Sequence, residues 1–236
     1  TADSLIVNAA TSHVEVRSIS TGSLSAAQAT LNAQSIEFAQ LSSFKSLAAS
    51  TTDTIALNAA VQTTVGDLLI DADIAGAAVA TYVLDSTSAS ALLTSAKDLI
   101  IQPSAFGKIR VMAPSTWDAA GDVQMGSAVD IFGAGAFSMN ADTDASGLGV
   151  LTLAVAITTI SPSVTLLALS GADLAMTANL QANAAAIEIS PSNSVGSALN
   201  LGVAGVGLNL DATELPLVLT TSTLTVGGIN TELVRV

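Results

Sequence analysis

The sequence predicts an all-β protein, a parallel β-helix (β-solenoid) of roughly nine coils with about 25 residues each. Three observations lead to this fold class. Short triplets with apolar first and third residues occur throughout the chain, asparagines recur at intervals of 24 and 26 residues near its start, and aromatic residues are scarce. We expect one elongated β domain over residues 1–236.

The triplets predict the strands. Successive side chains of a strand point to opposite faces, so two apolar residues around one central residue predict two buried positions and one exposed position. Glycine, serine or aspartate often precedes a triplet, as in 66-GDLLI-70 and 121-GDVQM-125, which predicts a turn there. Thirteen triplets begin at Val14, Ile36, Leu68, Ile109, Val123, Val129, Phe137, Leu151, Leu174, Ile187, Leu199, Leu208 and Leu224.

A helical interpretation is weaker. The stretch 24-LSAAQATLNAQSIEFAQL-41 is rich in good helix formers, but its apolar residues do not follow a period of 3.6. Valine, threonine, serine and glycine dominate after residue 120, and these residues lower helix propensity. We expect at most one capping helix or long loop, within residues 17–50.

The asparagines give a longer period. Asn8, Asn32 and Asn58 stand in the related pieces LIVNA, TLNA and ALNA. A period of 20 to 30 residues built from short strands is typical of a solenoid. We expect these asparagines, with Asn200 and Asn209, to stack as a ladder at a repeated corner. Half of the residues are hydrophobic and only 3% are aromatic, which suits a narrow lumen that large rings rarely enter.

The alternative fold is an antiparallel β-sandwich or jelly roll. Most neighbouring triplets in the second half of the chain begin 6 to 16 residues apart, which also suits strands joined by hairpins. The asparagine period and the scarcity of aromatic residues favour the solenoid.

Composition excludes several functions. The formal net charge is −13, from 6 basic and 19 acidic residues, so the chain repels phosphate backbones and we expect no nucleic-acid partner. Cysteine is absent, which excludes disulfides and thiol chemistry. No apolar run reaches the length of a membrane-spanning helix, so we expect no membrane insertion.

Candidates for catalysis or metal binding are few. His13 is the only histidine, and no G-x-S-x-G motif accompanies it, so we expect an exposed polar residue and no enzyme. Alternate aspartates, which can bind Ca²⁺ through their oxygens, occur as Asp71 with Asp73 and as Asp142 with Asp144. The second pair is the expected calcium site. We expect no other cofactor.

A sugar-binding surface would need aromatic side chains. Tyr82 and Trp117 are the only tyrosine and tryptophan, and Lys108 with Arg110 is the only close cationic pair. An exposed group containing Tyr82 and Trp117 would indicate a glycan-binding module.

Several stretches carry a resemblance to a known family. The segments 30-TLNAQSIEFAQ-40, 55-IALNAAVQTTVGDLLIDAD-73 and 197-SALNLGVAGVGLNLDA-212 resemble the passenger regions of secreted β-solenoid adhesins of the filamentous-haemagglutinin type. The resemblance is compositional. It implies an extracellular or cell-surface parallel β-helix used for adhesion or filament building.

The end segments suggest the function. The segment 222-STLTVGGINTELVRV-236 ends on an apolar, β-branched pattern without a polar cap, and 4-SLIVNA-9 is similarly apolar. The end of a solenoid is a row of unpaired strand edges. We therefore expect a non-catalytic structural subunit of an extracellular filament or surface layer, whose copies join head to tail by strand pairing. The alternative is an adhesin module that binds glycans or host surfaces.

Overall fold

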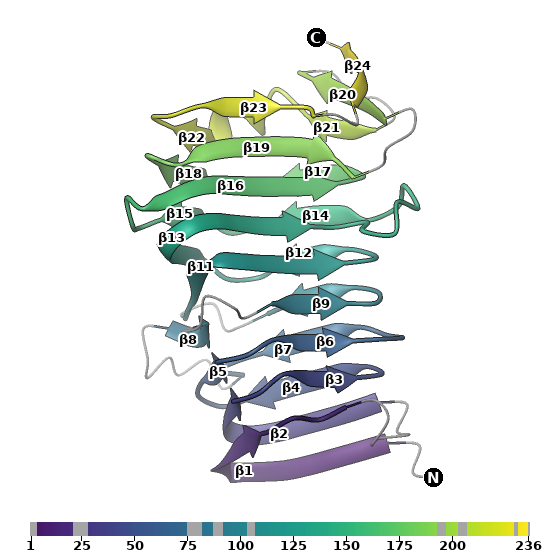
Figure 1. Cartoon of the computed structure of the whole chain (residues 1–236), viewed down its shortest axis with the longest axis vertical. Helices are drawn as coiled ribbons and strands as arrows, with labels where there is room; N and C mark the ends of the chain where they lie inside the picture. Colours follow the sequence, from purple (N-terminus) through teal and green to yellow (C-terminus); the bar gives the residue numbers. More distant parts are fainter. Residues whose placement is uncertain are drawn as a thin grey trace.

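The computed structural model describes residues 4–20, 28–74, 82–86, 92–102, 107–192, 197–202, 207–228 and 231–235. In this part of the chain, 21 strands form one sheet that winds into coils stacked along the long axis, and three strands form a small second sheet near the C-terminus (Figure 1). Every strand pairing is parallel, so the predicted β-solenoid is confirmed and the antiparallel sandwich is wrong.

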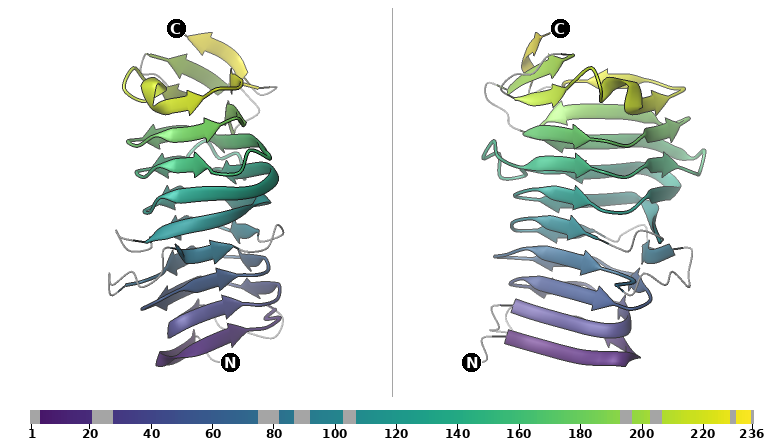
Figure 2. Two further views of the ribbon diagram at one scale, coloured as in Figure 1. Left: turned by 90° about the vertical axis from the view of Figure 1, so that its left-hand side faces the viewer. Right: turned by 180° about the vertical axis from the view of Figure 1, so that it is seen from behind.

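Each coil has three faces, which we name A, B and C in chain order (Figure 2). Face A contains the first halves of β1 (Ser4–Val16) and β2 (Gln28–Phe38), then β4 (Leu47–Thr51), β7 (Leu68–Asp71), β10 (Leu99–Ile101), β12 (Val123–Met125), β14 (Val150–Leu153) and β17 (Asp173–Met176).

Face B contains the second halves of β1 and β2, then β5 (Ile55–Leu57), β8 (Tyr82–Ser86), the first halves of β11 (Lys108–Ala119) and β13 (Val129–Asn140), β15 (Ile157–Thr159), β18 (Leu180–Asn183) and β22 (Val218–Thr220). Face C contains β3 (Ser42–Phe44), β6 (Val61–Thr63), β9 (Leu93–Ser95), the second halves of β11 and β13, β16 (Val164–Gly171), β19 (Ala186–Pro191) and β23 (Leu224–Val226).

Face B shows that the described chain makes nine coils, as predicted. One inward-facing residue per coil stacks on the equivalent residue of the next coil. From Val14 to Val218 the column takes eight steps, which average about 25 residues each. The column is Val14, Ile36, Ile55, Leu84, Ile109, Val129, Ile157, Leu180 and Val218.

The lumen is filled by inward side chains of all three faces, most of them aliphatic. Large rings enter it as well, contrary to the expectation of an almost purely aliphatic core. Trp117, Phe38, Phe44 and Phe137 are at most 2% exposed. Trp117 and Phe137 pack edge to face with ring centroids 5.3 Å apart, an arrangement that aromatic pairs favour.

The asparagine ladder is only partly as predicted. Asn32 Nδ2 donates to Asn8 Oδ1 at 2.9 Å, and Asn200 Nδ2 donates to Asn209 Oδ1 at 3.1 Å. These two pairs lie within strands, so the expected corner position is wrong. Asn58 is also not part of the ladder, because it follows β5 and its amide donates to Glu37 Oε1 at 2.7 Å.

Aspartates form the ladder at the corner that leads into face A. Asp98 Oδ1 accepts the backbone N–H of Asp122 at 2.9 Å, and Asp122 Oδ1 accepts that of Val150 at 2.8 Å. Gly121 makes room for this arrangement, because a Cβ there would lie 2.2 Å from Asp98 Oδ1. Each carboxylate thus aligns the next coil at the start of its face A strand.

Residues 28–50 contain β2, β3 and most of β4, whereas residues 17–20 lie in no strand and residues 21–27 fall outside the described residues. The capping helix or long loop expected within residues 17–50 therefore stays a prediction for residues 17–27. The described chain has no α-helix, and its one helical turn is the 3₁₀ turn η1 (Leu215–Leu217).

Candidate functional site

The N-terminal end of the solenoid is an open strand edge. β1 pairs with β2, and the described residues place no strand on its other edge. Its inward-facing Val7 and Val14 are only partly buried, whereas their partners Leu31 and Ile36 in the second coil are 2% and 1% exposed. Outward-facing Ile6 is 60% exposed. None of the described residues therefore covers the apolar lumen at this end.

The C-terminal end is open on faces B and C. β22 pairs with β18 and β23 pairs with β19, and no described strand lies beyond them. Inward-facing Leu224 is 37% exposed and Val218 is partly exposed, whereas their partners Ile187 and Leu180 are fully buried. Outward-facing Leu219 is 42% exposed.

Face A continues further than the other two faces at this end. β21 (Leu208–Leu210) lies above β17, with the Asn209 N–H donating to Asp173 Oδ1 at 2.9 Å. β20 (Ser197–Leu201) pairs with β21, and β24 (Thr231–Arg235) pairs with β20. Face A thus projects by two strands beyond the level at which faces B and C stop (Figure 1).

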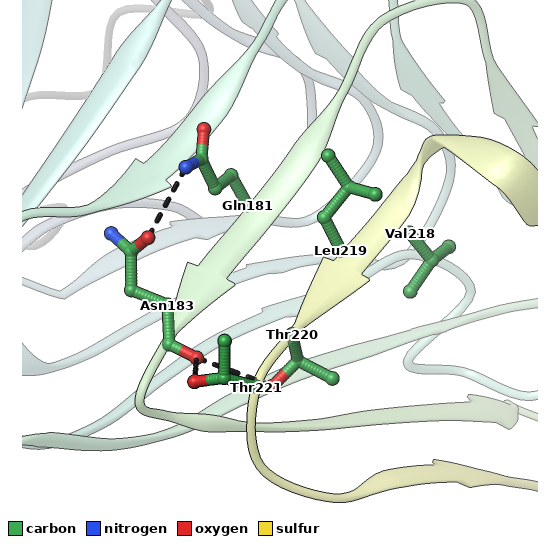
Figure 3. A pocket seen from close by; sticks show the side chains of 6 residues that line it. All are labelled: Gln181, Asn183, Val218, Leu219, Thr220 and Thr221. Atoms are coloured by element: carbon green, nitrogen blue, oxygen red, sulfur yellow. Dashed lines mark hydrogen bonds between the residues drawn. The ribbon is translucent and has the colours of Figure 1, made fainter.

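A groove of about 220 Å³ lies beside the last strand of face B (Figure 3). It is lined by Gln181, Asn183 and 218–221, with no charged side chain. The register of β18 and β22 shifts at Asn183, whose φ is 45°. Gln181 Nε2 donates to Asn183 Oδ1 at 3.2 Å, and Thr221 Oγ1 donates to the Asn183 carbonyl at 2.8 Å. The groove combines amides and hydroxyls with the apolar surface of Val218 and Leu219.

The outer side of face B carries a compact group of charged and aromatic residues on three successive coils. We call it the Tyr82 cluster; it comprises Tyr82, Asp85, Lys108, Arg110, Asp130 and Phe132. Tyr82 reaches across β11 to β13, where its hydroxyl donates to Asp130 Oδ2 at 3.1 Å and its ring meets Phe132 edge to face at 6.0 Å. The Arg110 guanidinium lies 5.2 Å from the Tyr82 ring centroid, within range of a cation–π interaction.

The charges of the Tyr82 cluster neutralise one another. Lys108 Nζ donates to Asp130 Oδ2 at 3.0 Å, and Arg110 donates to Asp85 through both Nε and Nη2. The hydrogen bond to Asp130 raises the pKa of Lys108, and that to Asp85 raises the pKa of Arg110. Burial, followed by the bond to Asp130, raises the pKa of Tyr82. An acidic sugar would therefore have to displace a carboxylate to reach either cation.

Tyr82 and Trp117 do not form an exposed group. Trp117 lies in the lumen and is fully buried, whereas Tyr82 is on the outer face. The structure instead pairs Tyr82 with Phe132, which the sequence analysis missed. Tyr82 and Asp130 are 48 positions apart, and no local motif signals their proximity.

Asp142 and Asp144, the two aspartates of the expected calcium site, lie in different environments. Asp142 is fully buried, and its carboxylate accepts hydrogen bonds from Ser146 Oγ at 2.7 Å, Ser192 Oγ at 2.6 Å and Gly147 N at 3.0 Å. Burial alone would raise the pKa of Asp142, but these bonds outweigh it and lower that pKa. Asp144 is exposed and accepts the Ser146 N–H. Calcium binding here remains a prediction, and it requires Asp142 to exchange these bonds for contacts with the ion.

Asp71 and Asp73, the other aspartate pair, also lie in different environments. Asp71 lies on the outer side of β7, where burial raises its pKa, and Asp73 is 1% exposed in the following turn. Among the described residues, no three histidine, aspartate or glutamate side chains are grouped to hold a metal ion.

His13 is exposed but has neighbours that the sequence did not predict. Its Nδ1 lies 2.9 Å from Ser35 Oγ, and its Nε2 lies 3.6 Å from Glu37 Oε2. A serine, a histidine and a carboxylate thus meet on the outer side of face B. The N–H of Ile36, which follows Ser35, donates to the Thr54 carbonyl at 3.0 Å. Because this Ile36 N–H is already engaged, it cannot serve as an oxyanion-hole donor beside Ser35. We therefore assign no catalysis to the group of Ser35, His13 and Glu37.

Comparisons with known proteins do not assign the chain to a family. No protein family, no curated protein and no solved structure matches the chain. In the described part of the structure, no helix is both long and apolar enough to cross a membrane.

Proposed function

We propose that this protein is a non-catalytic structural subunit of an extracellular filament or surface layer, and that its copies join head to tail by strand pairing. The observation that carries the proposal is the state of the lumen at its two ends. Inward-facing residues such as Val14 and Leu224 are partly exposed there, whereas their partners one coil away are at most 1% exposed.

Stacking would remove this exposure. All strands run in the same sense around the coil, so the first strand of one copy can add in parallel to the last strands of another. The added strand would satisfy the open N–H and C=O groups of an edge and bury apolar surface at about 25 cal/mol per Å². Such a contact joins two different surfaces and does not close on itself, so it produces a linear filament.

The extracellular location rests on the compositional resemblance to secreted solenoid adhesins. A chain without cysteine can fold in an oxidising compartment without mispaired disulfides.

Negative-stain microscopy and light scattering of the purified chain test the proposal. We expect rods whose length increases with protein concentration. Val218→Asp places a charge in the open lumen of the last coil and should leave single solenoids. The matched control Thr152→Asp adds the same charge at an outward-facing position in the middle of the stack and should leave assembly intact. Monomers of the parent chain at high concentration would contradict the proposal.

A glycan-binding module is the second candidate. It is favoured by the Tyr82 cluster, in which an aromatic pair lies beside hydrogen-bonding groups on an outer face. A glycan array tests it: binding that Tyr82→Ala abolishes would support this function, and an array without signal would oppose it.

A further inference from the structure

We infer that β20 is a removable stand-in for the first strand of the next copy. In a single copy β20 covers the edge of β21, and on assembly the face A half of β1 from the next copy replaces it. This inference rests on the proposed function and adds the step by which the contact forms. Three features lead to it: the level at which the last coil ends, the sequence of β20, and the hydrogen bonds of its asparagine.

The last complete coil ends at one level on all three faces. β21 lies on β17, β22 on β18 and β23 on β19, so these three strands belong to the ninth coil. β20 lies beyond β21 although it precedes β21 in the chain, and β24 pairs with β20 in turn (Figure 1). Without β20 and β24, the ninth coil would present one strand edge on each face.

β20 resembles the N-terminal strand that would replace it. Its segment 198-ALNL-201 and the segment 6-IVNA-9 of β1 both place one asparagine between two aliphatic residues. In β20 the residue before the asparagine, Leu199, is buried in the core over Leu208, and Val7, which has the same place in β1, also packs against the core. β1 can therefore take the position of β20 with its aliphatic residues inward.

The asparagine hydrogen bonds run in the same sense at both ends of the stack. Asn200 Nδ2 donates to Asn209 Oδ1 at 3.1 Å, and Asn32 Nδ2 donates to Asn8 Oδ1 at 2.9 Å. In each pair, the strand further from the N-terminal end is the donor. No described residue accepts a hydrogen bond from Asn8 Nδ2. With β1 in the position of β20, Asn8 can donate to Asn209 and take the place of Asn200.

β20 covers less of the end than β1 would. Its pairing with β21 lies on face A alone, and Val218 stays partly exposed on face B. β1 continues from face A to face B, where Val14 would lie over Val218 and extend the inward column. Outward-facing Glu15 would lie over uncharged Leu219, so no like charges meet. Exchange therefore keeps the asparagine bond and buries apolar surface that β20 leaves open, which favours assembly.

Gly207 permits β20 to lie on β21 and gives the first test. Its φ is 106°, and a Cβ there would lie 2.2 Å from the Ala198 carbonyl oxygen. Gly207→Ala therefore opposes the covered state, and it should lower the concentration at which rods form by about tenfold. A variant that forms rods less readily than the parent would show that β20 supports the end of the stack, and would contradict the inference.

A disulfide tests whether β20 must leave, because the chain has no cysteine of its own. Leu201 and Leu210 are directly paired, and such residues are about 4.8 Å apart, within the range that a disulfide spans. Leu201→Cys with Leu210→Cys should lose rod formation when oxidised and recover it on reduction. The matched control, Ser138→Cys with Ala168→Cys, joins two paired residues in the middle of the stack and should form rods in both states.

A second pair of variants reports where β1 adds. Asn8→Cys with Asn209→Cys should give a ladder of covalent multimers on a non-reducing gel. Asn8→Cys with Arg235→Cys reports addition beyond β24 without exchange, because Arg235 is the β24 residue that pairs with Asn200. This variant should stay uncrosslinked. The two ends of one copy are about 40 Å apart, which prevents an internal bridge.

The outcomes separate the two proposals. If the variant with Leu201→Cys and Leu210→Cys forms rods as readily when oxidised as when reduced, filaments form without exchange and the inference is wrong. It is also wrong if the parent forms rods but only the variant with Arg235→Cys crosslinks, or if neither Asn8→Cys variant does. If the parent chain forms no rods at high concentration, the proposed function itself fails.

Discussion

Asp142 anchors the turn between β13 and β14, and its replacement has a predictable cost. Its carboxylate accepts hydrogen bonds from Ser146 Oγ, Gly147 N and Ser192 Oγ at 2.6 to 3.0 Å, and it is fully buried. The bond to Ser192 joins this turn to the end of β19, which lies two coils further along the stack. The carboxylate therefore holds together segments that local sequence does not connect.

The magnitude follows from the donors left behind. A hydrogen bond to a charged group contributes about 1.5 to 3 kcal/mol, and bonds within one network are not additive. Asp142→Asn keeps the shape and tolerates the φ of 61°, but it loses the charge and one acceptor, and should cost about 2 kcal/mol. Asp142→Ala leaves all the donors unpaired and strains the backbone, and should cost about 3 to 5 kcal/mol.

The cost also depends on pH. Because the pKa of Asp142 is lowered in the folded state, its contribution is fully present above the unfolded value of about 4 and disappears as the pH falls through the folded value. The stability difference between the parent protein and Asp142→Asn should therefore be greatest near neutral pH and should shrink in acid.

Urea unfolding followed by the fluorescence of Trp117 measures these effects, because Trp117 pairs with Met139 near the end of β13. Exposed Asp144 is the matched control, and Asp144→Asn should change stability by less than about 0.5 kcal/mol. If Asp142→Asn is as stable as the parent at pH 7, the anchoring role is wrong. Added Ca²⁺ tests the metal prediction in the same assay: an ion bound by both aspartates raises the unfolding midpoint of the parent and not that of Asp144→Asn.

Three other substitutions have defined outcomes in equilibrium unfolding. Gly121→Ala should cost about 1 to 3 kcal/mol through its clash with Asp98 Oδ1, and the cost should fall in an Asp98→Ala background; equal costs in both backgrounds would oppose the clash. Arg110→Met should cost about 1 kcal/mol in low salt by removing its partly exposed ion pair with Asp85, and less in 1 M salt. Trp117→Phe should be nearly neutral, because lost packing is offset by removal of a buried Nε1 that has no hydrogen-bond partner among the described residues; a loss above about 3 kcal/mol would refute this.

Strand positions were predictable from the sequence because they depend on local alternation. All thirteen triplets lie in strands, including the two that share β13, Val129–Ile131 and Phe137–Met139. The triplet pattern did not predict the three-residue strands Val61–Thr63 and Leu93–Ser95. Their third residues, Thr63 and Ser95, point inward but are polar.

Register between coils was harder to predict, because coil length varies. Neighbouring residues in the face B column are as close as 19 positions and as far apart as 38. Spacing alone therefore placed Asn58 in a ladder to which it does not belong. The aspartates before the face A triplets were the better signal, since Asp98 and Asp122 each bond the equivalent position of the next coil.

The Tyr82 cluster, the anchor at Asp142 and the uneven C-terminal end were beyond sequence reasoning for the same reason. Each depends on which residues are neighbours two coils apart, or on a strand that lies out of chain order. β20 is such a strand, because it lies beyond β21 in the stack although it precedes β21 in the chain. A pattern with a variable period does not encode those pairs. Only the accumulated lengths of all intervening coils determine them.

The charge of the chain has a consequence for the proposed filament. Asp67, Asp98 and Asp122 precede the face A strands of three successive coils, and Asp173 begins the face A strand two coils beyond Asp122, so an acidic ridge runs parallel to the long axis. Two rods side by side would bring such ridges together, whereas end contacts are dominated by uncharged side chains. Growth along the axis should therefore exceed lateral association at 0.1 M salt, where charges interact over about 10 Å. At 1 M salt, where this range falls to about 3 Å, microscopy should show bundles of rods. Bundles that form in low salt and dissolve in high salt would mean that opposite charges hold rods together, which this distribution of aspartates does not provide.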